Sequence, residues 1–316
     1  MTEIIFKSIN NKILQSDSIL LVGHKNPDGD ACGAILAMYI YISSLGKSVA
    51  AYVHDAPPSY FKYLPRYDEI SHDAKVTSQK WNLVIIFDSS DWDHTGLLSD
   101  NFKDSTTVSM DHHFSNDGFA DINCINQSVS STCEIVYNFL TSIGADISRQ
   151  IATCLLLGII SDTGGFSNGA TTQESMKVAA NLVSHGAKIN QIAESVAKNK
   201  SIDGLRLWGL ILSRLQINAK YNIAYTYIKE DELKQYRVHE EEIDGFVNFL
   251  NIIYGVRAAM FLHLSSNHTK ISMRTTRDDI DLSQLAGMYG GGGHKKAAGF
   301  SVPWQIQDID GILKVL

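Results

Sequence analysis

Oxygen and nitrogen donors follow four separate apolar runs of this sequence. The apolar run 106–110 leads into Asp111-His112-His113, and three other apolar runs also lead into Asp or His residues. Buried ionisable groups are costly unless they have partners, so such strand ends either meet water or share a ligand. Because the pattern recurs, we expect a metal site that holds more than one ion. Its candidate ligands are His24, Asp28, Asp30, Asp88, His112 and Asp162.

A strand–helix–strand unit would position the first of these donors. The sequence predicts a strand at 18–23, a helix at 30–45 and a second strand at 48–53, which is typical of a parallel sheet. In such sheets, ligands bind in the crevice beyond the carboxyl ends of the strands. The polar residues that follow the strands would therefore share one crevice.

Asp28 and Asp30 also have a structural interpretation. Asn26-Pro-Asp-Gly29 is a good turn sequence, and Asp30 could cap the following helix. Capping alone leaves His24 without a role, four residues before Asp28. Because the helix dipole also favours anions at this end, we favour the metal interpretation.

Convergence of the four candidate aspartates would have an electrostatic cost. Two carboxylates about 5 Å apart repel by roughly 3 kcal/mol at an effective dielectric near 20, so four together require cations or protons. Two divalent ions would balance the four charges and would activate a water molecule as nucleophile. Carboxylate and imidazole donors without thiolate favour manganese or magnesium. We expect two Mn2+, for which Mg2+ or Co2+ could substitute.

The remaining pattern predicts an α/β fold class, with a parallel-sheet domain that has helices on both faces and a smaller α+β C-terminal domain. Elements of the first domain are expected at 3–15, 83–87, 105–110, 119–125, 131–143, 148–160 and 171–184. The second domain is expected to have strands at 222–228, 256–265 and 268–275, helices near 241–250 and 281–288, and at its end a Gly-rich loop, a strand and a helix. The predicted domains are 1–187 (metal-binding), 188–219 (a helical connector) and 220–316 (substrate-binding).

Composition disfavours several classes of protein. The chain has 316 residues, of which 44% are hydrophobic and 19% charged, as is ordinary for a globular protein. A net charge of −7 argues against long duplex nucleic acid, but not against a short anion beside bound cations. Four cysteines without CxxC spacing indicate buried thiols. No apolar run is long enough to span a bilayer and no leader opens the chain, so we expect a cytoplasmic protein without a membrane partner.

Short motifs occur in order along nearly the whole chain. The N-terminal motifs are Gly23-His-Lys-Asn-Pro-Asp-Gly-Asp-Ala-Cys-Gly33, Phe87-Asp-Ser-Ser90, Asp111-His-His113 and Gly158-Ile-Ile-Ser-Asp-Thr-Gly164. The C-terminal motifs are Gly290-Gly-Gly-Gly-His294 and Ala297-Ala-Gly-Phe300. This ordered set resembles the DHH phosphoesterase superfamily, and within it the DHH–DHHA1 proteins of the nanoRNase and pAp-phosphatase (NrnA-like) type. Each motif alone is weak, but the set is specific.

The resemblance implies a role for each candidate residue. One metal ion would be held by His24, Asp28 and Asp88, and the second by Asp30, Asp88, His112 and Asp162, so that Asp88 bridges them. His113 would lie beside the scissile phosphate as a general acid, and Asp111 would orient its neighbours rather than bind metal.

The C-terminal glycines have two interpretations from the residues alone. Successive glycine N–H groups can converge on an anion without obstruction by side chains, whereas a flexible hinge is the alternative. The adjacent His294 and the resemblance together favour substrate binding by Gly291, Gly292, Gly293 and His294. The resemblance also implies that Arg274 engages a substrate phosphate.

The resemblance implies a Mn2+-dependent phosphoesterase that degrades short oligoribonucleotides (nanoRNA) to mononucleotides and 3′-phosphoadenosine 5′-phosphate (pAp) to AMP. Its partners would be these short RNAs and nucleotide bisphosphates, and a homodimer is left open. A cyclic di-AMP or pApA phosphodiesterase is the nearest alternative. A non-catalytic nucleotide sensor is disfavoured by the complete ligand set. A RecJ-like exonuclease is disfavoured because the sequence shows neither an OB-like pattern nor a basic track.

Overall fold

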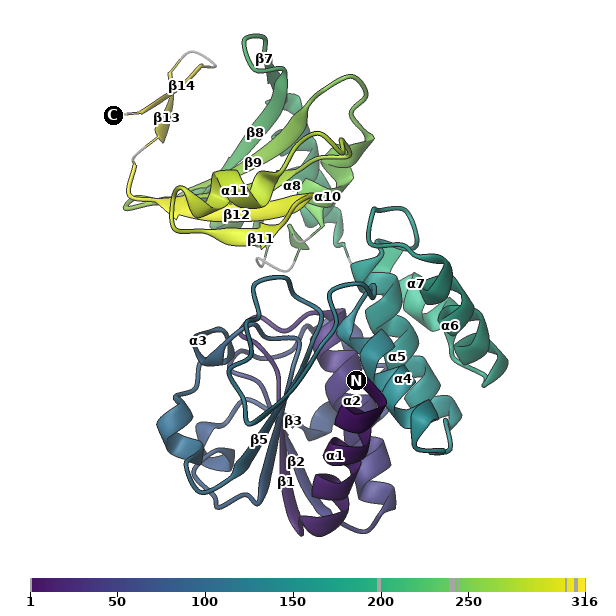
Figure 1. Cartoon of the computed structure of the whole chain (residues 1–316). Coiled ribbons are helices and arrows are strands. Elements are labelled where there is room, and N and C mark those ends of the chain that lie inside the picture. The colour runs from purple at the N-terminus through teal and green to yellow at the C-terminus, as the bar shows by residue number, and fades with distance from the viewer. Residues whose placement is uncertain are drawn as a thin grey trace. The chain divides into compact units, whose positions relative to one another are not determined.

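The computed structural model describes residues 2–197, 200–238, 242–243, 245–304, 306–309 and 312–315. The chain divides into two compact units, Met1–Ala197 and Lys198–Leu316 (Figure 1). The predicted boundaries at 187 and 219 stay a prediction. Within the described residues, no helix is both long and apolar enough to cross a membrane.

The first unit is built on a parallel sheet with the strand order β3-β2-β1-β4-β5-β6. Every strand pair in it is parallel, as the long apolar runs of the sequence predict. The strands are β1 (Ser18–Val22), β2 (Ser48–Tyr52), β3 (Ile70–Ser71), β4 (Leu83–Phe87), β5 (Thr106–Asp111) and β6 (Ile122–Ile125).

The two faces of this sheet are covered unequally. Helices α1, α2 and α4 contact the strands over one face, and α5 packs against α2 (Figure 1). The other face carries a smaller core with Trp81, Leu97 and Phe102, near the short helix α3. The helices are α1 (Thr2–Gln15), α2 (Gly29–Ser44), α3 (Trp92–Thr95), α4 (Thr132–Ser142), α5 (Arg149–Asp162), α6 (Gln173–Ser184) and α7 (Ile189–Ala197).

The second unit has a mixed sheet with the order β11-β12-β10-β9-β8-β7, in which only β8 and β9 are parallel. Helix α11 packs on one face, and α8 and α10 pack on the other. The elements are α8 (Ile202–Ser213), β7 (Gln216–Asn218), β8 (Ile223–Lys229), α9 (Glu230–Tyr236), α10 (Phe246–Phe249), β9 (Ala258–Leu264), β10 (Thr269–Arg274), α11 (Leu282–Gly287), β11 (Gly292–His294) and β12 (Ala297–Val302).

The predicted α/β class is confirmed, but the predicted terminal helix is wrong. The chain ends in two antiparallel strands, β13 (Ile306–Ile309) and β14 (Ile312–Val315). The sequence carries a hairpin signal that the helix prediction overlooked, because Asp-Gly separates two short apolar-rich runs. The predicted glycine loop is also partly wrong, since Gly292 to His294 form β11.

Candidate metal centre

Three adjacent strands deliver donors to one edge of the first sheet. His24 lies just after the end of β1, Asp88 directly follows β4, and Asp111 ends β5, followed by His112. Because β1, β4 and β5 are parallel neighbours, their carboxyl ends meet at one edge. The strand order reverses between β1 and β4, which is where open α/β sheets bind ligands.

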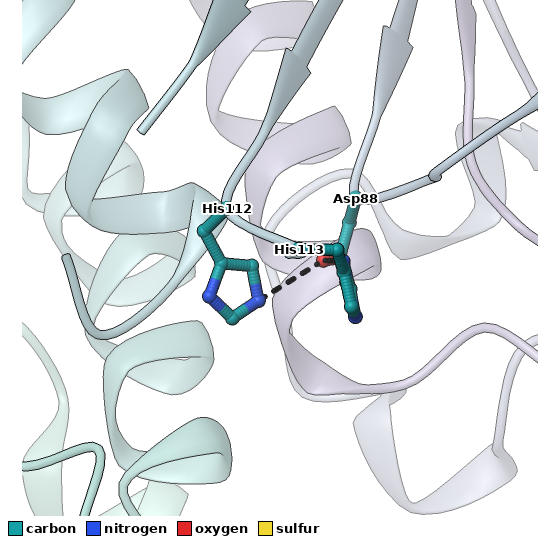
Figure 2. Close-up of side chains that lie close together, drawn as sticks. All are labelled: Asp88, His112 and His113. Carbon is teal, nitrogen blue, oxygen red and sulfur yellow. Dashed lines mark ion pairs between the residues drawn. The ribbon is translucent and has the colours of Figure 1, made fainter. Parts of the chain in front are cut away.

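Asp88 lies at the centre of this group. Its Oδ2 is 3.5 Å from His24 Nε2, and its Oδ1 is 3.5 Å from His112 Nε2; Figure 2 marks the contact with His112. The residue adopts a left-handed φ of 55°, which is uncommon for a residue with a Cβ and is concentrated at functional sites. Its N–H still donates to Met110 O in β5 at 3.1 Å. Asp88 therefore lies at the last hydrogen bond between β4 and β5, where the chain turns away from the sheet. The carboxylate therefore faces two histidines from two different strands.

Helices bring the other three aspartates to the same edge. Asp28 is the N-cap of α2, where its Oδ1 accepts the N–H of Asp30 and Ala31, and the same oxygen is 3.8 Å from His24 Nε2. Asp162 ends α5 and lies 3.1 Å from His112 Nε2. The turn interpretation and the metal interpretation of Asp28 are thus compatible.

Asp30 is held rigidly below this edge. Its side chain is fully buried, and its carboxylate accepts the backbone N–H of Thr132 at 2.6 Å and of Cys133 at 2.8 Å, at the N-terminus of α4. Its Oδ2 lies 3.9 Å from His112 Nε2. The segment that begins α4 thus orients a candidate ligand, while Ser131 caps the helix as the sequence indicates.

The six predicted donors fall into two groups, which a third group made of Asp88, His112 and His113 links. His24, Asp28 and Asp88 offer ligand atoms within 4.8 Å of one another, and so do Asp30, His112 and Asp162. Oxygen and imidazole donors at this spacing suit divalent ions of the manganese or magnesium type. The structure therefore brings together all six residues predicted from the sequence, in groups that could hold divalent metal. The assignment of each ligand stays a prediction.

Burial and mutual charge shift the pKa values of these groups strongly. Burial raises the pKa of Asp162 to about 6, against a hydrogen bond from His112. Burial also raises the pKa of Asp30, with Asp162 and Asp88 adding to the effect. Burial opposes charge on His24, but Asp28 and Asp88 outweigh it and raise its pKa. For Asp88, burial is outweighed by hydrogen bonds from His112 and His24, which lower its pKa well below the usual value.

His113 differs from its neighbour His112. Its Nδ1 lies 2.8 Å from Asp111 Oδ1 and 3.4 Å from Asp88 Oδ1, and its side chain keeps a quarter of its surface exposed. Asp111 itself is fully buried and faces His113. This placement fits a residue that contacts substrate more than a residue that only holds metal.

Sequence reasoning missed two residues at this edge. The ring of His94, on α3, stacks on the ring of His24 with centroids 4.9 Å apart and an angle of 7°. Thr132 Oγ1 donates to Asp88 Oδ1 at 3.2 Å. No spacing rule links either residue to the strand ends, because α3 and α4 reach the site only through the tertiary fold.

The predicted substrate-binding residues belong to the second unit. Arg274 ends β10, where its Nε donates to Asn248 Oδ1 at 2.6 Å and burial lowers its pKa to about 10. Its Cα pairs with Ala297, which pairs in turn with His294, so the three lie in one row of the sheet. The side chain of His294 lies outside the described part of the structure.

Two glycines of the run are explained by strand packing. A Cβ at Gly291 would lie 2.2 Å from Gly299 O, and one at Gly293, where φ is 131°, would lie 2.5 Å from Ala297 O. Gly292 has open space around it. The close approach of neighbouring strands therefore explains why glycine is needed at positions 291 and 293. Anion binding by Gly291, Gly292 and Gly293 stays a prediction.

Comparisons with known proteins agree with this geometry. The N-terminal domain of the DHH family matches residues 18–159, and the DHHA1 domain matches residues 220–316. The chain is 29% identical over 281 residues to the bifunctional oligoribonuclease and PAP phosphatase NrnA of Thermus thermophilus, covering 89% of this chain and 83% of that protein. It is 24% identical over 291 residues to NrnA of Bacillus subtilis, covering 90% of each.

A solved structure is also similar over nearly the whole chain. The exopolyphosphatase-related protein of Bacteroides fragilis matches with a TM-score of 0.86 and 27% identity, covering 94% of this chain and 90% of that one. Both domain models match in order, and the buried His and Asp cluster lies at the carboxyl edge of the first sheet. The chain therefore belongs to the DHH/DHHA1 family of phosphoesterases and is NrnA-like at modest identity.

Proposed function

We propose that this protein is a Mn2+-dependent phosphoesterase that hydrolyses short oligoribonucleotides to mononucleotides and pAp to AMP. The observation that carries the proposal is the meeting of His24 and His112 on opposite oxygens of Asp88, each beside further aspartates. The names of the NrnA relatives support the choice of substrates.

Two Mn2+ are the proposed cofactors. The first would be held by His24, Asp28 and Asp88, and the second by Asp30, His112 and Asp162 together with the other oxygen of Asp88. When bound, such a pair lowers the pKa of water and stabilises charge on the phosphoryl oxygens of an in-line displacement. The protein's own contribution is to hold donors in place before metal binds, as the hydrogen bonds of Asp28 and Asp30 do for these two residues.

His113 is the proposed general acid for the leaving oxygen. Its imidazole lies next to Asp88 and keeps part of its surface exposed, so a phosphoester at the metal site would lie within its reach. Asp111 opposite Nδ1 stabilises the protonated ring against burial, and the pKa of His113 is raised. A raised pKa favours the protonated ring, which is the form that can give a proton to an alkoxide leaving group.

The second unit is proposed to bind the rest of the nucleotide. Arg274 stays cationic near neutral pH although burial lowers its pKa to about 10, so it can pair with a phosphate. Gly291, Gly292, Gly293 and His294 would bind the same end of the substrate.

Hydrolysis assays with purified protein in Mn2+ test the proposal. We expect turnover of short RNAs and of pAp, and loss of turnover in Asp88→Ala because both donor groups lose their shared carboxylate. A matched variant is Asp100→Ala, which removes an exposed ion pair with Lys103 and should lower turnover much less. Wild-type turnover in Asp88→Ala would refute the metal assignment. Turnover of pApA or cyclic di-AMP alone would redirect the substrate assignment, and binding of nucleotide without turnover would indicate a sensor.

A further inference from the structure

A buried asparagine lies behind His113 and Asp111. Asn116 is 3% exposed, and its Nδ2 lies 2.8 Å from Asp111 Oδ2, 3.1 Å from Ser89 O and 3.2 Å from Ser109 Oγ. Its Oδ1 accepts the N–H of Gly118 at 2.9 Å. The amide orientation follows from chemistry, because the reverse orientation would place an oxygen against a carboxylate and a carbonyl.

The Asp111 carboxylate is held on both oxygens. Oδ1 accepts the backbone N–H of His112 at 2.8 Å and of His113 at 3.2 Å, and faces His113 Nδ1 at 2.8 Å. Oδ2 accepts from Asn116 at 2.8 Å. A carboxylate accepts hydrogen bonds, so the proton of the His113 ring lies on Nδ1. The plane of Asp111 thus sets both the tautomer and the direction of His113.

We propose that Asn116 is a positioning residue that fixes Asp111 and, through it, the tautomer and orientation of His113 for proton transfer to the leaving group. The inference rests on the proposed function of His113. With Nδ1 committed to Asp111, proton exchange with a substrate falls to Nε2. Without the amide, Asp111 Oδ2 is a buried acceptor that has lost its donor, so the carboxylate is no longer held in the orientation that faces His113. Partners of this kind typically contribute 10- to 100-fold in activity or metal affinity.

A structural role alone makes a different prediction. Asn116 also joins the end of β4 to the loop after β5, through Ser89 O and Gly118 N–H. If this were its only role, its loss would lower stability and would lower the turnover of all substrates alike. If it positions His113, the loss falls on substrates whose leaving group needs a proton.

The test compares leaving groups in Asn116→Leu and Asn116→Asp with those in the wild type. Leu keeps the volume but removes the amide, and Asp keeps the shape but removes the donor to Asp111. For nucleotide substrates with alkoxide leaving groups, we expect kcat to fall by about 10- to 100-fold with little change in KM. For bis-p-nitrophenyl phosphate, whose leaving group needs no acid, we expect a loss of less than about threefold. Asn82→Ala is the control, because Asn82 binds the start of β1 at the other edge of the sheet.

Nitrogen NMR of labelled histidine gives a second readout, with Mg2+ or without metal. At a pH above the pKa of His113, where the ring is neutral, we expect a single Nδ1–H tautomer in the wild type, assigned by its loss in His113→Gln, and a mixture of tautomers in both Asn116 variants. An equal loss on both substrate classes, or an unchanged tautomer, would overturn the inference. If the wild type hydrolyses no nucleotide, the proposed function fails, while the tautomer measurement still decides whether Asn116 positions His113.

Discussion

Burial and neighbouring charges have opposite effects on the pKa values of the histidines at the sheet edge. His24 and His112 both have raised pKa values in the metal-free protein, although burial alone would lower them, because aspartates face them. Asp162 has its pKa raised to about 6 by burial. Protons and metal ions therefore compete for the same atoms, since histidine binds metal only as the neutral ring and aspartate only as the anion.

This competition predicts that Mn2+ affinity rises with pH. As the pH falls, His24 and His112, whose pKa values are raised, and Asp162, whose pKa is about 6, take up protons that metal binding must displace, so affinity should fall by about tenfold per pH unit for each proton released. Calorimetry between about pH 6 and pH 8, in buffers of different ionisation enthalpy, measures both affinity and proton release. An affinity that stays constant over this range would contradict the assignment of these ligands.

At the scale of elements, helices α2 and α5 must pack closely to place Asp30, which lies in α2. A Cβ added at Gly158, inside α5, would lie 2.4 Å from Asp30 Oδ1 and 2.3 Å from Cys133 Sγ. Helices α2 and α5 are in extensive contact, and both contact α4. A glycine inside a helix costs about 1 kcal/mol relative to alanine, so its presence here reflects the space that Asp30 needs.

Gly158→Ala should therefore weaken the site that contains Asp30 more than the site that contains His24. We expect Mn2+ affinity of the second site to fall by about 10- to 100-fold, with the first site retained. Titration with Mn2+ followed by electron paramagnetic resonance counts the ions bound. The control is Gly209→Ala, inside α8, where a Cβ meets nothing within 4 Å. Two unchanged sites in Gly158→Ala would show that Asp30 tolerates the extra methyl group.

At the scale of the whole molecule, each unit has a core of its own. The largest core of the first unit joins its sheet to α1, α2, α4 and α5, whereas the second unit has separate cores on the two faces of its sheet. Glu232 stabilises the second unit, because its Oε2 accepts from Arg214 Nη1 at 2.8 Å and from the backbone N–H of Lys229 at 2.8 Å. The Arg214 guanidinium also lies 4.7 Å from the centre of the Tyr227 ring.

Acid should destabilise the second unit through this pair. Burial opposes charge on Glu232, but Arg214 outweighs it and lowers its pKa below the usual 4.5. A lowered folded-state pKa means that the stabilisation is present above about pH 4.5 and is lost as the pH falls through the folded value. We expect Glu232→Gln to cost about 1 kcal/mol at neutral pH, measured by calorimetric unfolding. Glu174→Gln, which breaks an exposed pair with Lys177, is the control and should change stability by only a few tenths of a kcal/mol.

The sequence by itself predicted the longer strands, most helices and six candidate donors, which the structure brings together. A fully apolar run such as β4 is typical of a buried parallel strand. A polar residue directly after such a strand lies at the carboxyl edge of the sheet. The sequence also contains an Asp-Gly pair before β14, which favours a hairpin. The predicted terminal helix disregarded this signal.

Only the tertiary structure decided where the donors lie relative to one another and which residues support them. Asp88 faces two histidines because β1 and β5 flank β4, an order that no local pattern contains. His94, Thr132 and Asn116 reach the site through loops and helix ends, whose positions depend on packing rather than on sequence spacing. The physical reason is that periodicity encodes which face of an element is buried, whereas contacts between elements depend on the shape of the assembled core.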